Sequence, residues 1–199
     1  MNVKGLFVSL YRSLKQLVNG RKFLLKLMPK HSICAEIGVY KGNFSDEILD
    51  LVEPRKLHLI DPWKYHDKDD YSTALFGGIA GSQDSMDDIY ESVREKFKPE
   101  LDKKIIDIHR DYSQDAYEEF PDEYFDWIYI DGNHKYEYVK KDLELYYPKV
   151  KKKGYITGDD YKKFGWWDGG VKKAVKEFMR ENDVKKIKIK KSQFILKKI

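Results

Sequence analysis

The sequence predicts one α/β domain with a mostly parallel seven-stranded sheet, a C-terminal antiparallel hairpin, and helices on both faces. Residues 126–161 predict a strand, a helix and a strand, because two short apolar runs flank a segment with helical spacing. Short apolar runs and helical segments also alternate along the rest of the chain, which is typical of a parallel sheet. Two final strand-like runs, residues 184–190 and 194–196, are separated so briefly that they must pair as a hairpin.

The composition fits a single folded unit. The length of 199 residues suits one domain with a full core, and an apolar content of 41% argues against disorder. We expect a helical segment at residues 1–30 and a folded domain at residues 31–199. Cys34 is the only cysteine, so no disulfide framework exists and a reducing cytoplasm is expected. No apolar run approaches the roughly 18 residues that span a bilayer, and no signal-peptide pattern is present.

The net charge of +4 hides an asymmetry between the ends and the middle of the chain. Residues 1–30 carry seven basic side chains and no acid, whereas residues 183–199 carry seven lysines and one aspartate. Residues 31–182 therefore carry a net charge of −9. An acidic body with two basic ends does not indicate a nucleic-acid-binding surface, so we expect no nucleic-acid partner.

The N-terminal segment predicts two helices. Residues 3–18 place apolar side chains on one face at helical spacing, and Asn19-Gly20 ends this helix. Residues 23–28 predict a second short helix, ended by Pro29. We expect the segment to pack against the body or against a second subunit. Its basic side chains leave association with an anionic membrane surface open as the alternative.

A glycine-containing turn follows the first predicted strand, residues 32–37, and leads into a helix predicted at residues 43–51. The turn runs from Glu36 to Gly42, and Ser45 is the predicted N-cap of the helix. Glycine there lets the backbone approach a ligand closely, and the helix N-terminus favours an anion. The turn lacks the Gly-x-Gly-x-x-Gly pattern of dinucleotide-binding proteins, which argues against a nicotinamide cofactor.

The second predicted strand, residues 57–60, ends in an Asp-Pro-Trp sequence that begins at Asp61. An acid at this position can accept hydrogen bonds from ribose hydroxyls, and a simple strand-end cap is the alternative. Trp63 is expected either to cover a flat ring or to pack. Residues 64–86 are irregular, and a connection of this length is usually a lid or binding loop. A helix is predicted at residues 87–97.

Three aspartates follow the two strands predicted at residues 127–130 and 155–157, which a helix at residues 136–147 connects. The strands should be parallel and, as neighbours, about 4.8 Å apart, so that their carboxyl ends open onto one crevice. Strand-end acids are often only caps. Two adjacent carboxylates at a buried strand end, however, repel each other unless a cation or donors compensate. Hard oxygen ligands suit Mg²⁺ better than Zn²⁺. The three candidate ligands are Asp131, Asp159 and Asp160.

The remaining elements complete the sheet and its helices. Residues 105–108 predict a third strand. Residues 164–170 form a loop with two adjacent tryptophans, expected either to offer a substrate platform or to be buried against the lid. A helix is predicted at residues 171–180. In the hairpin we expect Ile187 and Ile189 to point inward and the lysines outward.

Four stretches of the sequence together resemble class I S-adenosylmethionine-dependent methyltransferases, over a match from about residue 33 to residue 194. The stretches are AEIGVYKGNFS, LHLIDPW, DWIYIDGNHKYEYVKKDL and GYITGDDY. The last two resemble the metal-dependent O-methyltransferase branch that includes macrolide-sugar and glycosyl enzymes. The resemblance implies a Rossmann-like sheet and S-adenosylmethionine as the cofactor. One departure is that Arg110-Asp-Tyr-Ser stands where the family often has Gly-Asp-Ser.

The resemblance also implies roles for individual residues. Asp131, Asp159 and Asp160 would hold Mg²⁺, and His134 would be the general base. Catechol-type relatives have lysine at the base position, so His134 points toward the sugar branch. Adenine contacts would come from Asp111, Ser113 or Gln114. The full set of implied cofactor-binding residues is Glu36, Gly38, Tyr40, Gly42, Ser45, Asp61, Trp63, Asp111, Ser113 and Asp131.

From the residues and the resemblance together we expect an Mg²⁺-dependent O-methyltransferase of the cytoplasm. Its acceptor would be a hydroxyl of a small molecule, in particular a sugar or glycan. Metal coordination would lower the pKa of that hydroxyl, and His134 would take its proton near the ordinary pKa of histidine. Two other functions stay open. One is a nucleotide-dependent oxidoreductase, which the final hairpin disfavours, and the other is a non-catalytic protein that retained the cofactor pocket.

Overall fold

The computed structural model describes residues 21–163 and 165–199. Its sheet has seven strands in the order β3-β2-β1-β4-β5-β7-β6. The first five in sequence are parallel, and β7 lies antiparallel between β5 and β6. In chain order the elements are β1 (Ile33–Ile37), α2 (Asn43–Val52), β2 (Lys56–Ile60), η1 (Asp69–Tyr71), α3 (Gln83–Lys96), α4 (Lys98–Asp102), β3 (Ile106–His109), α5 (Ser113–Ala116), η2 (Tyr117–Glu119), β4 (Phe125–Ile130), α6 (Tyr136–Tyr146), β5 (Val150–Gly158), α7 (Gly170–Glu181), β6 (Val184–Lys190) and β7 (Gln193–Lys198). The predicted fold class is confirmed.

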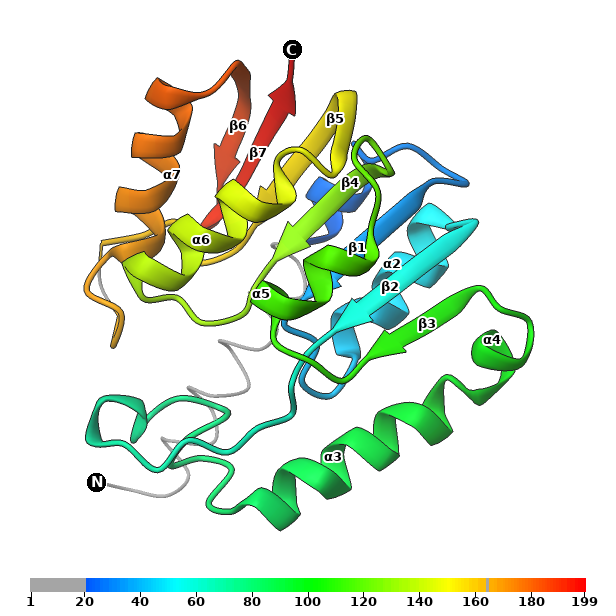
Figure 1. Ribbon diagram of the computed structural model, residues 1–199, viewed down its shortest axis with the longest axis vertical. Coiled ribbons are helices and arrows are strands. Elements are labelled where there is room, and N and C mark those ends of the chain that lie inside the picture. The colour runs from blue at the N-terminus through cyan, green and yellow to red at the C-terminus, as the bar shows by residue number, and fades with distance from the viewer. Residues whose placement is uncertain (1–20, 164) are drawn as a thin grey trace.

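Helices cover both faces of the sheet (Figure 1). Helices α5, α6 and α7 lie on one face, over a core to which β4 contributes Ile128 and Ile130. Helices α2 and α3 and residues 24–28 pack on the other face, against Trp127 and Tyr129 of the same strand. Successive side chains of a strand point to opposite faces, so β4 supplies both cores and is buried on both sides.

The N-terminal predictions are tested only in part. The helix expected at residues 3–18 lies outside the described residues. Residues 21–25 are helical, and a turn follows them where the second helix was expected to continue. Leu24, Leu25 and Met28 are buried against the sheet, so this part of the segment packs on the body. Within the described residues, no helix is long and apolar enough to cross a bilayer.

Two strand predictions differ from the structure. Strand β5 begins at Val150, five residues before the predicted start, because Val150 pairs with Phe125 of β4 ahead of an irregularity that contains three lysines and has no apolar pattern. Ile187 and Ile189 of β6 do not point inward, since they are 41% and 37% exposed. Strand β6 is the edge of the sheet, and its pairing with β7 shifts register between Lys186 and Lys188. An edge strand that carries many lysines resists pairing with other chains.

Candidate active site

Four neighbouring strands end at the same level of the sheet. Ile37 of β1 pairs with Ile60 of β2 and Ile130 of β4, and Ile130 in turn pairs with Gly158 of β5. A cavity of about 720 Å³ opens at this edge. The residues that follow the four strand ends are Gly38, Asp61, Asp131 and Asp159, and all four line the cavity. The predicted crevice at the carboxyl ends of these strands is therefore present.

The turn after β1 is held by Asp61. The carboxylate of Asp61 accepts hydrogen bonds from the amides of Val39 and Tyr40, both at 2.9 Å, and from the amide of Trp63 at 2.7 Å. Burial raises the pKa of Asp61, and these three donors partly offset the rise. The φ angle of Gly38 is 90°, and a Cβ there would lie 2.3 Å from the carbonyl oxygen of Asp131. The turns after β1 and β4 can therefore touch only because residue 38 is glycine.

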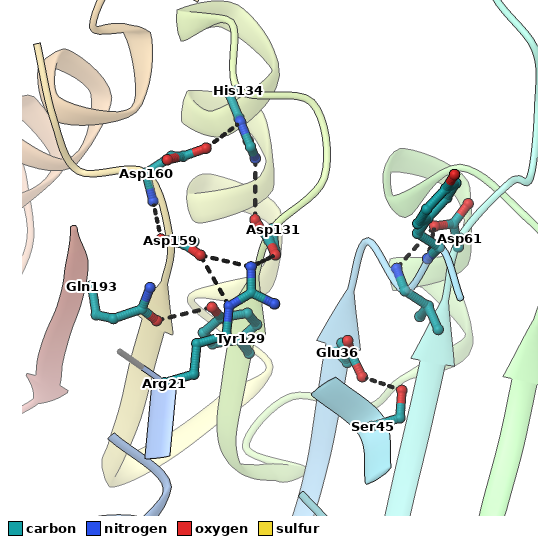
Figure 2. A network of polar contacts seen from close by, with 12 residues as sticks. Arg21, Glu36, Ser45, Asp61, Tyr129, Asp131, His134, Asp159, Asp160 and Gln193 are labelled. Carbon is teal, nitrogen blue, oxygen red and sulfur yellow. Dashed lines mark hydrogen bonds and ion pairs between the residues drawn. The ribbon is translucent and has the colours of Figure 1, made fainter. Parts of the chain in front are cut away.

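Glu36 lies beneath this turn as a buried acid. It is 2% exposed, and its Oε2 accepts a hydrogen bond of 2.5 Å from the hydroxyl of Ser45 (Figure 2). Burial is the main cause that raises its pKa to about 8, and the bond from Ser45 opposes the shift. Ser45 is therefore not the N-cap that the sequence predicted. Gly42 takes that position, with φ 66°, and Ser45 lies in the first turn of α2, where its hydroxyl bonds to Glu36.

Not every predicted cofactor-binding residue faces the cavity. Glu36, Gly38, Tyr40 and Asp61 line it, whereas Gly42 and Ser45 lie behind them. Trp63 is fully buried, and its indole nitrogen donates a hydrogen bond of 2.8 Å to the carbonyl of Tyr40. Of its two expected roles, the structure favours packing beneath the turn.

The segment after β3 contributes through Ser113. Its hydroxyl donates a hydrogen bond of 2.6 Å to Asp142 of α6, and both residues line the cavity together with Gln114. Burial raises the pKa of Asp142 to about 7, against the bond from Ser113. Asp111 is exposed and does not line the cavity. Asp142 was not predicted as a site residue from the sequence, although an acid on the apolar face of a predicted helix, three residues after Val139, was a usable signal.

The three predicted ligands of the metal lie together at the ends of β4 and β5 (Figure 2). Each of their six carboxylate oxygens has a donor nitrogen of the protein within 3.2 Å. Arg21 bridges two of them, because its Nη2 lies 2.6 Å from Asp131 and 2.7 Å from Asp159. The amide of Asp160 donates to the other oxygen of Asp159 at 2.6 Å. Sequence reasoning missed Arg21, which is separated from these partners by 110 and 138 positions.

His134 and Lys162 complete the set of donors. His134 lies 3.2 Å from Asp131 through Nε2 and 3.0 Å from Asp160 through Nδ1. Lys162 lies 2.8 Å from the second oxygen of Asp160. Burial would raise the pKa of Asp160, but His134 and Lys162 outweigh it and lower that pKa. Burial and the charge of Asp131 raise the pKa of Asp159 to about 6, although Arg21 opposes them.

This arrangement does not fit Mg²⁺. A magnesium ion in octahedral geometry needs unpaired carboxylate oxygens as ligands beside its waters, whereas every oxygen of the three carboxylates already has a donor nitrogen within 3.2 Å. Three cationic side chains, Arg21, His134 and Lys162, balance the three carboxylates. Among the described residues, no group of three His, Cys, Asp or Glu side chains has the geometry to hold a metal ion.

The charge state of His134 differs from the expectation. Burial alone would lower its pKa, but hydrogen bonds and charge attraction from Asp131 and Asp160 raise the pKa to about 10. At neutral pH the ring is therefore an imidazolium. The expectation that His134 titrates near the ordinary value is wrong for this arrangement, because two carboxylates flank the ring.

Aromatic side chains from the predicted lid and from the tryptophan loop meet above His134. Tyr71 and Phe76 lie with ring centroids 5.5 Å and 5.9 Å from that of Trp166, which stacks against the ring of His134 at 5.9 Å. The amide of Asn133 donates a hydrogen bond of 2.9 Å to the hydroxyl of Tyr71. The connection between β2 and α3 is thus tied to the loop that carries His134.

Comparison with known sequences gives a family match over most of the parallel sheet. Residues 35–161 match the family model described as a methyltransferase domain. A curated relative, an uncharacterized protein of Acanthamoeba polyphaga mimivirus, is 49% identical over 41 residues. That match covers 21% of this chain and 19% of the relative, so the chain aligns with about a fifth of the relative's length.

Solved structures resemble the whole fold at low sequence identity. The O-methyltransferase NovP has a TM-score of 0.65 and 20% identity, with 89% of this chain and 79% of NovP covered. A Staphylococcus aureus protein provisionally assigned as a caffeoyl-CoA O-methyltransferase has a TM-score of 0.62 and 13% identity, with 94% and 83% covered. A Streptococcus mutans protein provisionally assigned as a methyltransferase, solved with SAH (S-adenosylhomocysteine), has a TM-score of 0.56 and 16% identity, with 90% and 95% covered. These likenesses extend the agreement in fold to nearly the full chain.

Proposed function

The chain belongs to the methyltransferase domain family, and on that premise we propose that it transfers a methyl group from S-adenosylmethionine to a hydroxyl of a small molecule, in particular a sugar or glycan. One observation carries the proposal. A single cavity is lined both by Glu36 and Asp61, at the ends of β1 and β2, and by His134 with its carboxylate partners over β4 and β5. Figure 2 shows these two groups of side chains. A cofactor site and a proton-transfer site side by side are what such a reaction requires.

The first half of the cavity suits the methyl donor. Its Glu36 and Asp61 carboxyls offer acceptors to the ammonium and ribose hydroxyls of S-adenosylmethionine. Gly38, Val39 and Tyr40 line this half of the cavity, so the backbone of the turn is available to the ligand. Ser113, Gln114 and Asp142 line the same cavity, and we assign the adenine to them. SAH, which the Streptococcus mutans protein binds, is the product that the donor would leave.

The second half suits an acceptor with hydroxyl groups. The hydroxyl oxygen attacks the methyl carbon of the sulfonium, the carbon–sulfur bond breaks as the carbon–oxygen bond forms, and SAH leaves as a neutral thioether. The hydroxyl proton passes to His134. We infer that the entering acceptor first displaces Asp131 or Asp160 from the ring, which lowers the pKa of His134 toward its ordinary value. The imidazolium then releases its proton to solvent, and the neutral ring can accept the hydroxyl proton. The rings of Phe76 and Trp166 provide surfaces on which a sugar can pack. Mg²⁺ has no part in this step, because the carboxylates are already balanced by cations of the protein.

A screen of acceptors tests the proposal. The full chain is incubated with S-adenosylmethionine and a panel of sugars and glycosides, and products are followed by mass spectrometry. We expect one hydroxyl compound to gain a methyl group, and its analogue already methylated at that hydroxyl to remain unchanged. Methylation of an amine or of RNA, with no product from any hydroxylated acceptor, would contradict the proposal.

A further inference from the structure

We propose that Arg21 is a built-in cation that occupies the place between Asp131 and Asp159 and excludes divalent ions from it. The sequence resemblance implies a magnesium site made of these carboxylates, whereas the structure fills it with a guanidinium. The hydrogen bonds of Arg21, the aromatic rings around it and the charges of the cluster all favour a guanidinium at this position.

The bonding of Arg21 matches a guanidinium site. Its Nη2 contacts both carboxylates, and its Nε adds a second hydrogen bond of 3.0 Å to Asp159. Asp159 therefore receives two donors of the same planar group on one oxygen, while Asp131 receives one (Figure 2). Arginine presents donors in such a fixed fork and stays charged at every physiological pH. Its side chain is only 20% exposed, so exchange with solvent ions is restricted.

Aromatic rings surround the guanidinium in a way that a hydrated metal ion would not require. The Cζ of Arg21 lies 5.2 Å from the ring centroid of Phe44 and 5.6 Å from that of Tyr129. Arginine stacks on aromatic faces and is weakly hydrated, whereas Mg²⁺ keeps its waters tightly. Tyr129 is itself fixed, because its hydroxyl donates a hydrogen bond of 2.9 Å to Gln193. The position between Asp131 and Asp159 therefore suits a guanidinium better than a hydrated Mg²⁺.

The charges around the cluster also favour a cation at the position of Arg21. Without Arg21, Asp131 and Asp159 would face each other with His134 and Lys162 bound mainly on the sides of Asp131 and Asp160. Two close carboxylates then favour binding of a new cation or of a proton. Removing the guanidinium should therefore expose a site that a divalent ion can fill, and leaving it in place should keep that ion out.

Mn²⁺ binding to the full chain tests this inference. Binding is measured from the electron paramagnetic resonance signal of free Mn²⁺ and from thermal melting. We expect wild type to bind no Mn²⁺ at the cluster. Arg21→Met should bind one Mn²⁺, at least about tenfold more tightly than any residual binding by wild type, and Mn²⁺ should raise its melting temperature. The double variant with Asp131→Asn should lose that gain. Arg94→Met is the matched control, since Arg94 pairs with Glu91 at the exposed surface and should behave as wild type.

Two results would overturn the inference. The first is that wild type binds one Mn²⁺ and that Asp131→Asn abolishes this binding. This result can be obtained even if no arginine variant folds. The second is Arg21→Met with no more affinity for Mn²⁺ than wild type. If Arg21→Met does not fold, Arg21→Lys keeps the positive charge, and it must then exclude Mn²⁺ as wild type does. Because these measurements follow an ion and not methyl transfer, they do not depend on the proposed acceptor.

Discussion

Individual residues of this site differ in charge from what their types suggest. His134 carries a proton at neutral pH because two carboxylates flank it, and Glu36 keeps its proton up to about pH 8 because it is buried. Strongly shifted groups that line one cavity indicate a functional site. Both shifts depend on contacts that a ligand would change, so each gives a measurable expectation.

Replacement of His134 should affect the rate and spare the cofactor. His134→Ala should lower the rate of methyl transfer by roughly 10²–10⁴, the usual contribution of general acid–base catalysis. The affinity for SAH should stay as in wild type, because the ring lies over β4 and β5 and away from Glu36. His31→Ala, at an exposed histidine, is the control. If His134→Ala transfers methyl groups at nearly the wild-type rate, another group must take the proton.

Cofactor affinity should depend on pH through Glu36. The free protein holds the Glu36 proton below about pH 8. The positive donor favours the ionised carboxylate, so binding releases a proton, and affinity should rise with pH until about pH 8 and then level off. Glu36→Gln cannot ionise. The ratio of wild-type to variant affinity for S-adenosylmethionine, measured by calorimetry from about pH 6 to about pH 9, should therefore increase, and a constant ratio would remove Glu36 from the donor site.

At the scale of elements, the site depends on the turns that follow β1, β2, β4 and β5. Tyr40, Trp63 and Asp160 each have positive φ, at 52°, 42° and 55°. Non-glycine residues in this region carry backbone strain that the surrounding contacts must outweigh. Here the contacts are the hydrogen bonds that the backbone amides of Tyr40 and Trp63 donate to Asp61, and the ion pairs of Asp160. These contacts therefore hold the turns in their strained conformations.

Substitution of Gly38 tests how closely two of these turns must approach. Gly38→Ala should destabilise the protein by more than the roughly 1–3 kcal/mol that positive φ costs alone, because its Cβ would also overlap the backbone of Asp131. Gly81→Ala is the matched control, since φ there is 79° but no atom lies within 4 Å of the added Cβ. Urea denaturation of both variants measures the difference. Equal losses of unfolding free energy would mean that the contact between the turns is not required.

At the scale of the whole molecule, the sequence predicted what local patterns determine. Apolar runs and helical spacing gave the parallel strands, the crossover helices and the closing hairpin. The positions just after the strand ends then gave Asp61, Asp131 and the Asp159–Asp160 pair, because parallel strands end at one edge. Side chains that follow a strand end can be placed without knowing any distant contact.

Other features depend on tertiary contacts and so could not be predicted. Arg21 reaches carboxylates more than a hundred positions away, and nothing in its local sequence marks that contact. Ser45 has the residue type of an N-cap, but its hydroxyl is used by Glu36. The start of β5 lacks an apolar pattern, because three lysines follow Val150 directly. In each case a partner from another element decides the role of the residue.

Binding of the two candidate cofactors to the full chain tests the central claim most directly. Calorimetric titration with SAH should give one site per chain, and Asp61→Ala should weaken it by roughly 1–3 kcal/mol, the cost of removing a buried hydrogen-bond partner. NAD should give no binding heat, since the turn after β1 lacks the dinucleotide pattern. Tight binding of NAD with no response to SAH would contradict the account and favour an oxidoreductase.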